Sequence, residues 1–348
     1  MQSQTGIKLK PVKPFYDFYD RSKKIRYFGA DNLFPNALKS YMDVSPSLAE
    51  CVNRKSMFLG LVTGNELIDT DIYKKLIADY SLYNGFALYV MYDSDANVQS
   101  LKYIPFETIR LGERGQLGNY VNVKYCADWS GIDTVNTRRI SSSQATTFQL
   151  WTDNMQTTLD RCKAADEEDK CYNCIYYYNG STTVYPQSAL VPVLNYASAE
   201  VGLANLVYRE VRTNFTPSKI IAYQKQSESD DQTFLSGLRE LQGDENAFKV
   251  LTMSFASVDE KPEILDFAPE DYTQRVETTS TLCKNNIFSA FNQTQFLRLS
   301  DGGLGFSSDI ISEIYKYYNN LLSSERNNLQ VALRNFDVNL TINNLPYE

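Results

Sequence analysis

Histidine is absent from this chain of 348 residues. Without an imidazole, the chain cannot form a Ser-His-Asp triad, a Cys-His nucleophile pair or a His-ligated zinc site. No apolar run approaches the ~18 residues that a membrane-spanning helix needs, so an integral membrane protein is not expected. Only six cysteines occur, which is too sparse for a disulfide scaffold.

Basic residues are also in deficit, with 34 Lys and Arg against 42 Asp and Glu, a net charge of -8. This balance disfavours a simple DNA-coating protein, which would be basic. Hydrophobic residues make up 43% and charged residues 22%, which is ordinary globular usage. The polar start, Met1 to Gly6, lacks the apolar core of a signal peptide, so we expect an intracellular chain.

The segment 1–185 carries the patterns of an α+β body. Ser45 can cap a helix that Pro46 opens and Gly60 ends, and a second helix is expected between Thr70 and Gly85. After Gly85 the spacing of apolar residues is no longer helical, and strand patterns follow at 86–92, 98–104, 120–126, 148–151 and 175–178. The hairpin spacing of the first two strands predicts a mostly antiparallel sheet.

The N-terminal segment 1–30 is basic, with seven Lys and Arg against two Asp, a net charge of +5. The part from 8 to 26 interleaves these charges with aromatic residues, among them Phe18 and Tyr19. Such an arm can dock on an acidic neighbour or on nucleic acid, or it can lie as a solvated strap on its own fold.

The second half alternates long helices with a small acidic unit. A long helix is expected from Pro186 to Asn214, and a small β-α-β unit follows at 217–267. That unit holds ten acidic and five basic residues, a net charge of -5. A second long helix is expected from Pro269, then a glycine-rich loop at 296–306, a third long helix at 308–334 and a short strand at 338–342.

Three motifs bear on whether the chain carries chemistry. Cys171 and Cys174 form a C-x-x-C pair near Cys162, but a zinc site would need a fourth cysteine such as Cys126, so isolated thiols fit better. The stretch 93–97 begins like a calcium loop and lacks its glycine and closing glutamate, so it is expected to be a turn. The glycine-rich stretch 301–305 is not a P-loop. We therefore predict no catalytic, cofactor-binding or metal-binding residues.

The order of elements resembles the portal proteins of tailed bacteriophages, of the short HK97-like type. Local stretches support this resemblance: Gly29-x-Asp31-Asn32-x-x-Pro35, Leu82 to Val90 with the turn and Pro105, Asn214-x-x-Pro217-Ser218, and Asn286 to Phe291. The chain departs from the family in Pro192, in the loop 159–170, and in ending soon after the last helix.

The resemblance implies an α+β portal fold with little or no crown. It assigns residues 1–185 to the wing, 186–216 to a first stem helix, 217–268 to a β-α-β clip and 269–291 to a second stem helix. Residues 292–307 would be the tunnel loop, and 308–348 a long wing helix with a terminal strand.

By this resemblance, the chain is a non-enzymatic subunit of a ring, typically a dodecamer, at one capsid vertex of a virion assembled in the host cytoplasm. Double-stranded DNA would pass through the ring, and the partners would be the large terminase, a head–tail adaptor and the major capsid protein. The tunnel loop implies DNA-channel residues, namely Gln295, Arg298, Ser300, Asp301, Gly302 and Gly303. The clip implies docking residues for terminase or adaptor, namely Lys225, Glu228, Asp230, Asp231 and Glu240.

Two alternatives remain open at the level of sequence. One is a metal-dependent hydrolase that uses carboxylates, and the other is a different ring-forming head–tail adaptor. Arg298 itself has two interpretations, a phosphate contact or a salt bridge between subunits.

Overall fold

The computed structural model of the protein describes residues 18–62, 67–115, 119–130, 145–166, 172–212, 219–224, 232, 250–255, 272–300, 308–336 and 340–341. The chain divides into two compact units. The smaller unit contains Ala199–Cys283, and the larger unit contains Leu9–Ser198 and Lys284–Glu348. The fold is α+β, as the sequence predicts.

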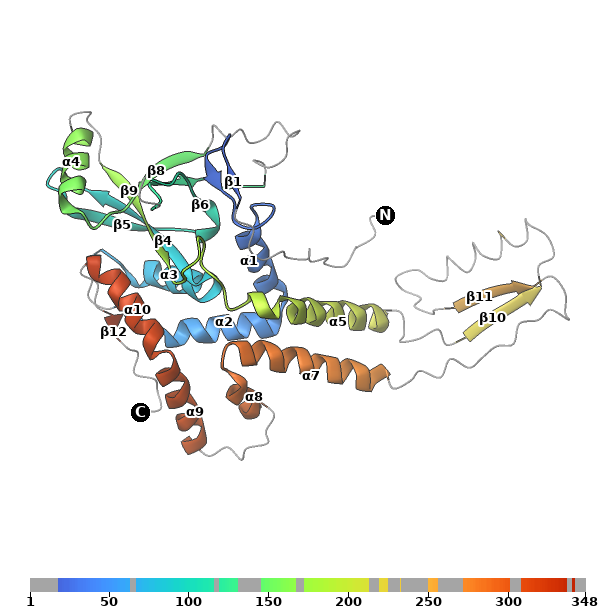
Figure 1. The fold of residues 1–348 in the computed structure, drawn as a ribbon. Coiled ribbons are helices and arrows are strands. Elements are labelled where there is room, and N and C mark those ends of the chain that lie inside the picture. Colours follow the sequence, from blue (N-terminus) through green and yellow to red (C-terminus); the bar gives the residue numbers. More distant parts are fainter. Residues whose placement is uncertain are drawn as a thin grey trace. The chain divides into compact units, whose positions relative to one another are not determined.

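A six-stranded sheet forms the centre of the larger unit, in the order β5-β4-β9-β8-β7-β6 (Figure 1). Neighbouring strands are antiparallel except β8 and β9, which are parallel, so the predicted mostly antiparallel sheet is confirmed. The strands are β4 (Gly85–Tyr92), β5 (Val98–Ile104), β6 (Ile109–Leu111), β7 (Asn122–Tyr125), β8 (Thr146–Leu150) and β9 (Asn173–Asn179).

The three helices α1 (Phe34–Val44), α2 (Pro46–Phe58) and α3 (Thr70–Tyr83) pack on one another, and α3 lies against β4 and β5 (Figure 1). Ser45 caps α2 through a hydrogen bond that its side chain accepts from the Leu48 N–H at 3.3 Å. Asp69 caps α3 in the same way from the Ile72 N–H at 2.7 Å. Both caps satisfy amides that a helix start leaves without partners. Sequence patterns predicted α2 and α3 and missed α1.

The C-terminal part differs from the predicted layout in two ways. The segment expected as a loop after Phe291 contains the helix α8 (Thr294–Ser300). The single helix expected at 308–334 is two helices, α9 (Ser308–Leu321) and α10 (Ser323–Leu333), followed by the 3₁₀ turn η5 (Arg334–Phe336). The terminal strand β12 (Leu340–Thr341) pairs with β3 (Leu61–Val62).

Several short elements complete the larger unit. The strands β1 (Tyr19–Asp20) and β2 (Ile25–Arg26) form a hairpin. The helix α4 (Met155–Asp166) includes residues 159–166 of the stretch 159–170, which was expected to be a loop. The turns η1 (Phe106–Thr108) and η3 (Val191–Val193) are 3₁₀ helices. Pro192 lies in η3, just before the long helix α5 (Leu194–Arg212), which therefore starts later than Pro186.

The core of the larger unit joins the sheet to the C-terminal helices. The Tyr176 hydroxyl on β9 donates to the Ala332 carbonyl of α10 at 2.9 Å. The Tyr176 ring also meets Trp151 and Phe336, with ring centroids 5.2 and 5.1 Å apart. Segments far apart in sequence therefore share one buried cluster.

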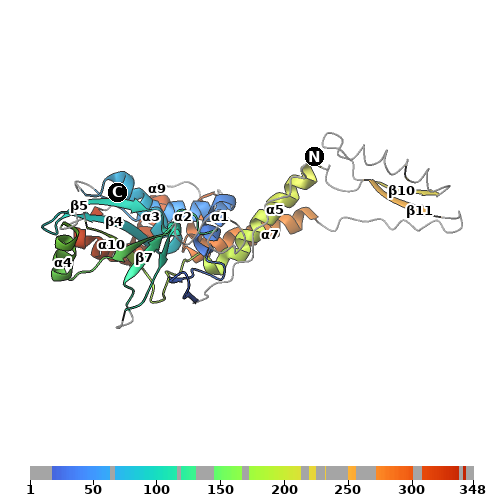
Figure 2. The same cartoon turned by 90° about the horizontal axis from the view of Figure 1, so that it is seen from above.

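The described part of the smaller unit includes the C-terminal part of α5, the N-terminal part of α7 (Tyr272–Ala290) and two strands. In both views α5 and α7 lie side by side (Figures 1 and 2). Strands β10 (Lys219–Gln224) and β11 (Val250–Phe255) are paired in parallel, which requires a crossover connection. The β-α-β pattern predicts a helix between these strands, at 231–241, and most of that stretch lies outside the described residues.

Among the residues that the structure describes, no helix is both long enough and apolar enough to cross a bilayer.

Candidate functional site

The junction where α7 ends and α8 begins contains a buried polar site, directly before the predicted channel residues in the sequence. Its centre is Gln293, whose side chain is fully buried. The Gln293 amide nitrogen donates to the Cys51 carbonyl at 2.9 Å and to the Tyr318 hydroxyl at 2.7 Å. Its amide oxygen accepts from the Arg54 guanidinium at 2.9 Å. One side chain therefore ties the junction to both α2 and α9.

The backbone of the α7 C-terminus aims Gln293 into this position. Asn292 adopts the left-handed conformation with φ of 56°, which asparagine tolerates better than most residues. The Gln293 N–H donates to the Phe288 carbonyl at 2.8 Å, and the Asn292 N–H donates to the Ser289 carbonyl at 3.0 Å. This pair of bonds is a Schellman motif, which ends the helix and reverses the chain direction.

Arg54 is the second key residue of the junction. Its guanidinium lies over the Phe296 ring at 4.4 Å and over the Phe288 ring at 5.6 Å. It also pairs with Glu50 one helical turn earlier. A guanidinium that stacks on aromatic faces and donates to an amide is held in one orientation. Arg54 therefore couples α2 to both the end of α7 and the start of α8.

An aromatic cluster that includes Phe296 packs at the same junction. Phe296 of α8 lies 5.4 Å from Tyr318 and 5.6 Å from Tyr315, measured between ring centroids. Phe58 at the end of α2 lies 4.9 Å from Tyr318. Burial raises the pKa of the Tyr318 hydroxyl well above its usual range, so this group stays protonated, and its oxygen accepts the hydrogen bond from the Gln293 amide. The cluster fixes α8 by packing as well as by hydrogen bonds.

The predicted DNA-channel residues follow Gln293 in the sequence. Gln295 is on α8 and is half-buried. The backbones of Arg298 and Ser300 belong to α8, while their side chains are outside the described residues. Asp301, Gly302 and Gly303 lie outside the described residues altogether. The structure thus places the first half of the predicted tunnel loop on a short, anchored helix.

The predicted clip residues Lys225, Glu228, Asp230, Asp231 and Glu240 lie outside the described residues.

The other motifs have structural explanations where they are described. The Asp93 carboxylate accepts from the Asn97 N–H at 2.8 Å and from the Asp95 N–H at 3.0 Å, which is the turn that the sequence predicts. Burial raises the pKa of the Cys174 thiol to about 12, so it is a thiol rather than a reactive thiolate. Cys171 is outside the described residues, and among the described ones no group of three or more candidate metal ligands is found.

Gln293 and Arg54 have no signal in the sequence that marks them as a pair. Gln293 follows the helix stop at Asn292, where polar residues usually face solvent, so its burial has no local signal. Arg54 is one of three charged residues on α2, and nothing in the sequence distinguishes it from the other two. The pairing of these residues joins positions 239 apart in the chain, and only the folded structure brings them together.

Comparisons with known proteins come from structure alone, since no protein-family model and no curated protein match the sequence. The chain is similar to a chain in the virion of a native gene transfer agent (GTA) particle, with 12% sequence identity and a TM-score of 0.50; the match covers 90% of this chain and 85% of that chain. It is also similar to a chain in the neck of the native GTA particle computed with C12 symmetry, with 14% sequence identity and a TM-score of 0.50. That match covers 90% of this chain and 86% of that chain. At these identities the likeness shows a shared fold.

Proposed function

We propose that this chain is a structural subunit of the head and neck of a phage-like particle, and that it acts there as the portal protein. The single observation that carries the proposal is the fold likeness, over 90% of the chain, to a component of a particle neck computed with C12 symmetry. The order of elements in the sequence supports the same assignment.

In this proposal, twelve copies form a ring with a central channel. Residues 1–185 and 308–348 would be the wing, the paired helices α5 and α7 the stem, and residues 217–268, which include β10 and β11, the clip. Residues 292–307, which include α8, would form the tunnel loop, with Gln295 and Arg298 as candidate contacts to DNA phosphates. The clip would dock the large terminase during packaging and the head–tail adaptor afterwards, and the wing would contact the major capsid protein.

The charge of the chain supports a conduit for double-stranded DNA. Each phosphate that a Lys or Arg neutralises adds a salt-dependent term to the affinity, and a channel that grips its cargo would stall it. A subunit with a net charge of -8, repeated around a ring, repels DNA at long range and favours sliding. The role we propose is positional and electrostatic, and it involves no enzymatic step.

The first test is the mass of the purified full chain by native mass spectrometry, together with negative-stain images. A closed ring of about a dozen subunits with a central hole is the expected result. A compact dimer carrying stoichiometric metal would overturn the proposal and favour a carboxylate-based hydrolase.

Arg298→Ala separates the two roles proposed for Arg298. If the residue contacts only DNA, the variant forms the same ring as the wild type and packages DNA less efficiently. If the variant fails to form a ring, Arg298 belongs to the interface between subunits. Thr294→Ala, at an exposed position on the same helix, is the matched control and should leave both ring formation and packaging unchanged.

A further inference from the structure

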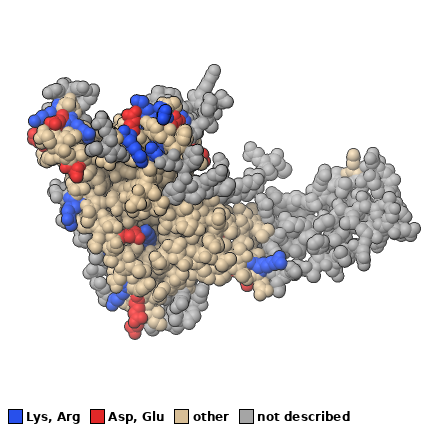
Figure 3. Space-filling model, in the orientation of Figure 1, with Lys and Arg blue, Asp and Glu red and all other residues tan. Residues whose placement is uncertain are grey.

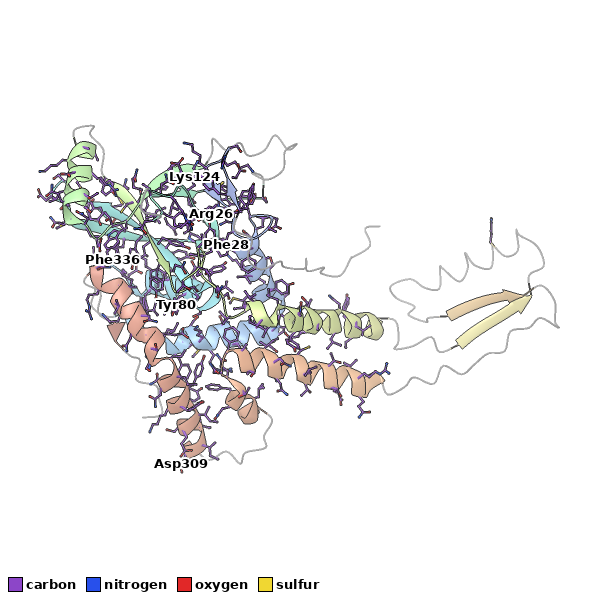
Figure 4. All side chains as sticks on the ribbon, in the orientation of Figure 1. Arg26, Phe28, Tyr80, Lys124, Asp309 and Phe336 are labelled. Carbon is purple, nitrogen blue, oxygen red and sulfur yellow. The ribbon has the colours of Figure 1, made fainter. Side chains whose placement is uncertain are left out.

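A basic and aromatic surface lies at the β6–β7 end of the sheet, on the larger unit. It is formed by residues 18–26, 113–115 and 119–125, which we call the hairpin surface. The β1–β2 hairpin lies against β6, so these three segments are neighbours in space. Figure 3 shows Lys and Arg side chains gathered in this region, and Figure 4 places Arg26 and Lys124 near each other there. The site described above uses none of these residues.

The hairpin is held in place by specific contacts. The Lys124 ammonium donates to the Lys23 carbonyl at 3.0 Å, and Lys24 pairs with Glu113 at 3.1 Å. Beneath the hairpin, Ile25 is buried in a small cluster with Cys126 and Trp129. The described part of the N-terminal arm is therefore a hairpin that lies on the chain's own fold.

The hairpin surface carries a clear excess of positive charge. Its six basic residues outnumber its two acidic residues, a net charge of +4, in a chain whose total is -8. The basic residues are Arg21, Lys23, Lys24, Arg26, Arg114 and Lys124, and the acidic ones are Asp20 and Glu113.

Two of these cations make cation–π contacts with an aromatic ring. The guanidiniums of Arg26 and Arg114 lie 5.9 and 5.1 Å from the centroid of the Tyr120 ring. Phe18, at the start of the hairpin, has 43% of its surface exposed. Arginines held on aromatic faces, next to an exposed aromatic ring, are the composition that protein interfaces favour.

We propose that the hairpin surface is a docking site for an acidic polypeptide segment of a partner protein. Nucleic acid fits the surface less well, because every nucleotide carries a phosphate that cannot avoid Asp20 and Glu113, whereas a polypeptide can place neutral residues opposite these two carboxylates. The overall negative charge of the chain also opposes the approach of a polyanion as dense as DNA. An acidic protein segment can pair with the cations and pack apolar side chains on Phe18. This inference does not depend on the proposed portal function.

The test measures binding of the full-length protein to two probes by fluorescence anisotropy at low and moderate salt. One probe is a short peptide in which Glu and Asp alternate with occasional Leu, and the other is a DNA duplex with the same number of negative charges. The variant is Arg21→Glu with Lys24→Glu, two exposed residues of the hairpin turn. The matched control is Lys74→Glu with Lys75→Glu, two exposed residues of α3 that change the net charge by the same amount.

We expect the wild type and the control to bind the peptide more tightly than the duplex. The hairpin variant should bind the peptide at least about tenfold more weakly, because each reversal removes an attraction and adds a repulsion. Three results would overturn the proposal: tighter binding to the duplex, an equal loss in the control, or no measurable binding of the peptide to the wild type. None of them bears on ring formation, which tests the proposed function separately.

Discussion

Gln293 makes three hydrogen bonds with a side chain that has no exposed surface. A buried amide of this kind stabilises a structure only while every partner is present, because each group left without a partner has lost its water. The geometry therefore makes Gln293 a sensitive position in the larger unit.

We predict that Gln293→Leu lowers the free energy of unfolding of the larger unit by about 2–4 kcal/mol, because the Cys51 carbonyl, the Tyr318 hydroxyl and Arg54 lose a buried partner. The measurement is urea unfolding followed by tryptophan fluorescence. The chain has two tryptophans, Trp129 and Trp151, and both lie in the larger unit. Gln295→Leu, at a half-buried position two residues away, should change stability far less; equal effects at both positions would contradict the prediction.

Asp79 is a second residue whose buried surroundings affect stability, here through the pKa of its carboxyl. It is buried on α3, and burial and the nearby Glu107 raise the pKa of its carboxyl to about 8. Its Oδ2 atom accepts from the Tyr103 hydroxyl at 2.9 Å and from the Phe106 N–H at 3.0 Å. An unfolded Asp titrates near pH ~3.9, so between about pH 4 and pH 8 the folded chain keeps a proton that the unfolded chain has lost.

This difference makes the folded state more stable at low pH than at high pH. The stabilising contribution of Asp79 is complete below about pH 4 and is lost as the pH rises through 8, with a slope of at most about 1.4 kcal/mol per pH unit. We predict that Asp79→Asn, which keeps the acceptor oxygen, makes the fall in stability between pH 5 and pH 8 shallower. Urea unfolding at several pH values measures this slope. Asp95→Asn is the control at an exposed position, and an unchanged slope in Asp79→Asn would refute the assignment.

At the scale of elements, the sequence predicts best where local signals agree. Ser45 and Pro46 mark the start of α2, and the change from helical to strand-like spacing of apolar residues after Gly85 marks β4. Helix α2 and strand β4 both lie where these patterns place them. Gly85 is required at that point, because a Cβ there would lie 2.8 Å from the Tyr178 carbonyl oxygen of β9. The mostly antiparallel sheet followed from the same signals.

The elements that sequence patterns missed depend on contacts between distant segments. Helix α8 has seven residues, too few to be stable alone, and it is held by Arg54 and Tyr318 from other helices. The break between α9 and α10 has no proline or glycine to signal it. The candidate junction was missed for the same reason, since nothing near Gln293 in the sequence indicates its partners on α2 and α9.

Arg326 explains the break between α9 and α10. Its guanidinium donates to the Phe58 carbonyl at 2.9 Å and to the Asn319 side-chain oxygen at 2.8 Å, and it also reaches the Asn319 carbonyl at 2.5 Å. It thus binds carbonyls at the ends of α2 and α9 that the helices leave without partners. The planar fork of arginine reaches all three oxygens, whereas a lysine ammonium is a single point charge.

We therefore predict that Arg326→Lys lowers the stability of the larger unit by about 1–3 kcal/mol, although the charge is kept, because at least one buried carbonyl loses its donor. Tryptophan-detected urea unfolding measures the change. Arg334→Lys, at an exposed position after α10, should lie within about 0.5 kcal/mol of the wild type. A result for Arg326→Lys as small as that of the control would show that charge alone holds the break.

At the scale of the whole molecule, the main buried cluster of the described residues lies within the larger unit, and it draws on both the N-terminal part and the C-terminal helices. A core that closes within one unit needs no contribution from the segment inserted between its two halves. The long insertion between α5 and α7 is therefore expected to be separable from the folding of the larger unit.

This separability can be tested by replacing residues 213–271 with a Gly/Ser linker of about ten residues, which spans roughly 17 Å as a flexible chain. We predict that the larger unit of this variant unfolds with the same tryptophan-detected midpoint as in the full chain, because Trp129, Trp151 and their packing partners are all retained. If the portal proposal holds, the same variant should also lose binding to terminase, since the proposed clip residues are removed. A collapse of the tryptophan transition would instead mean that the inserted segment contributes to the stability of the larger unit, and that the two compact units fold as one.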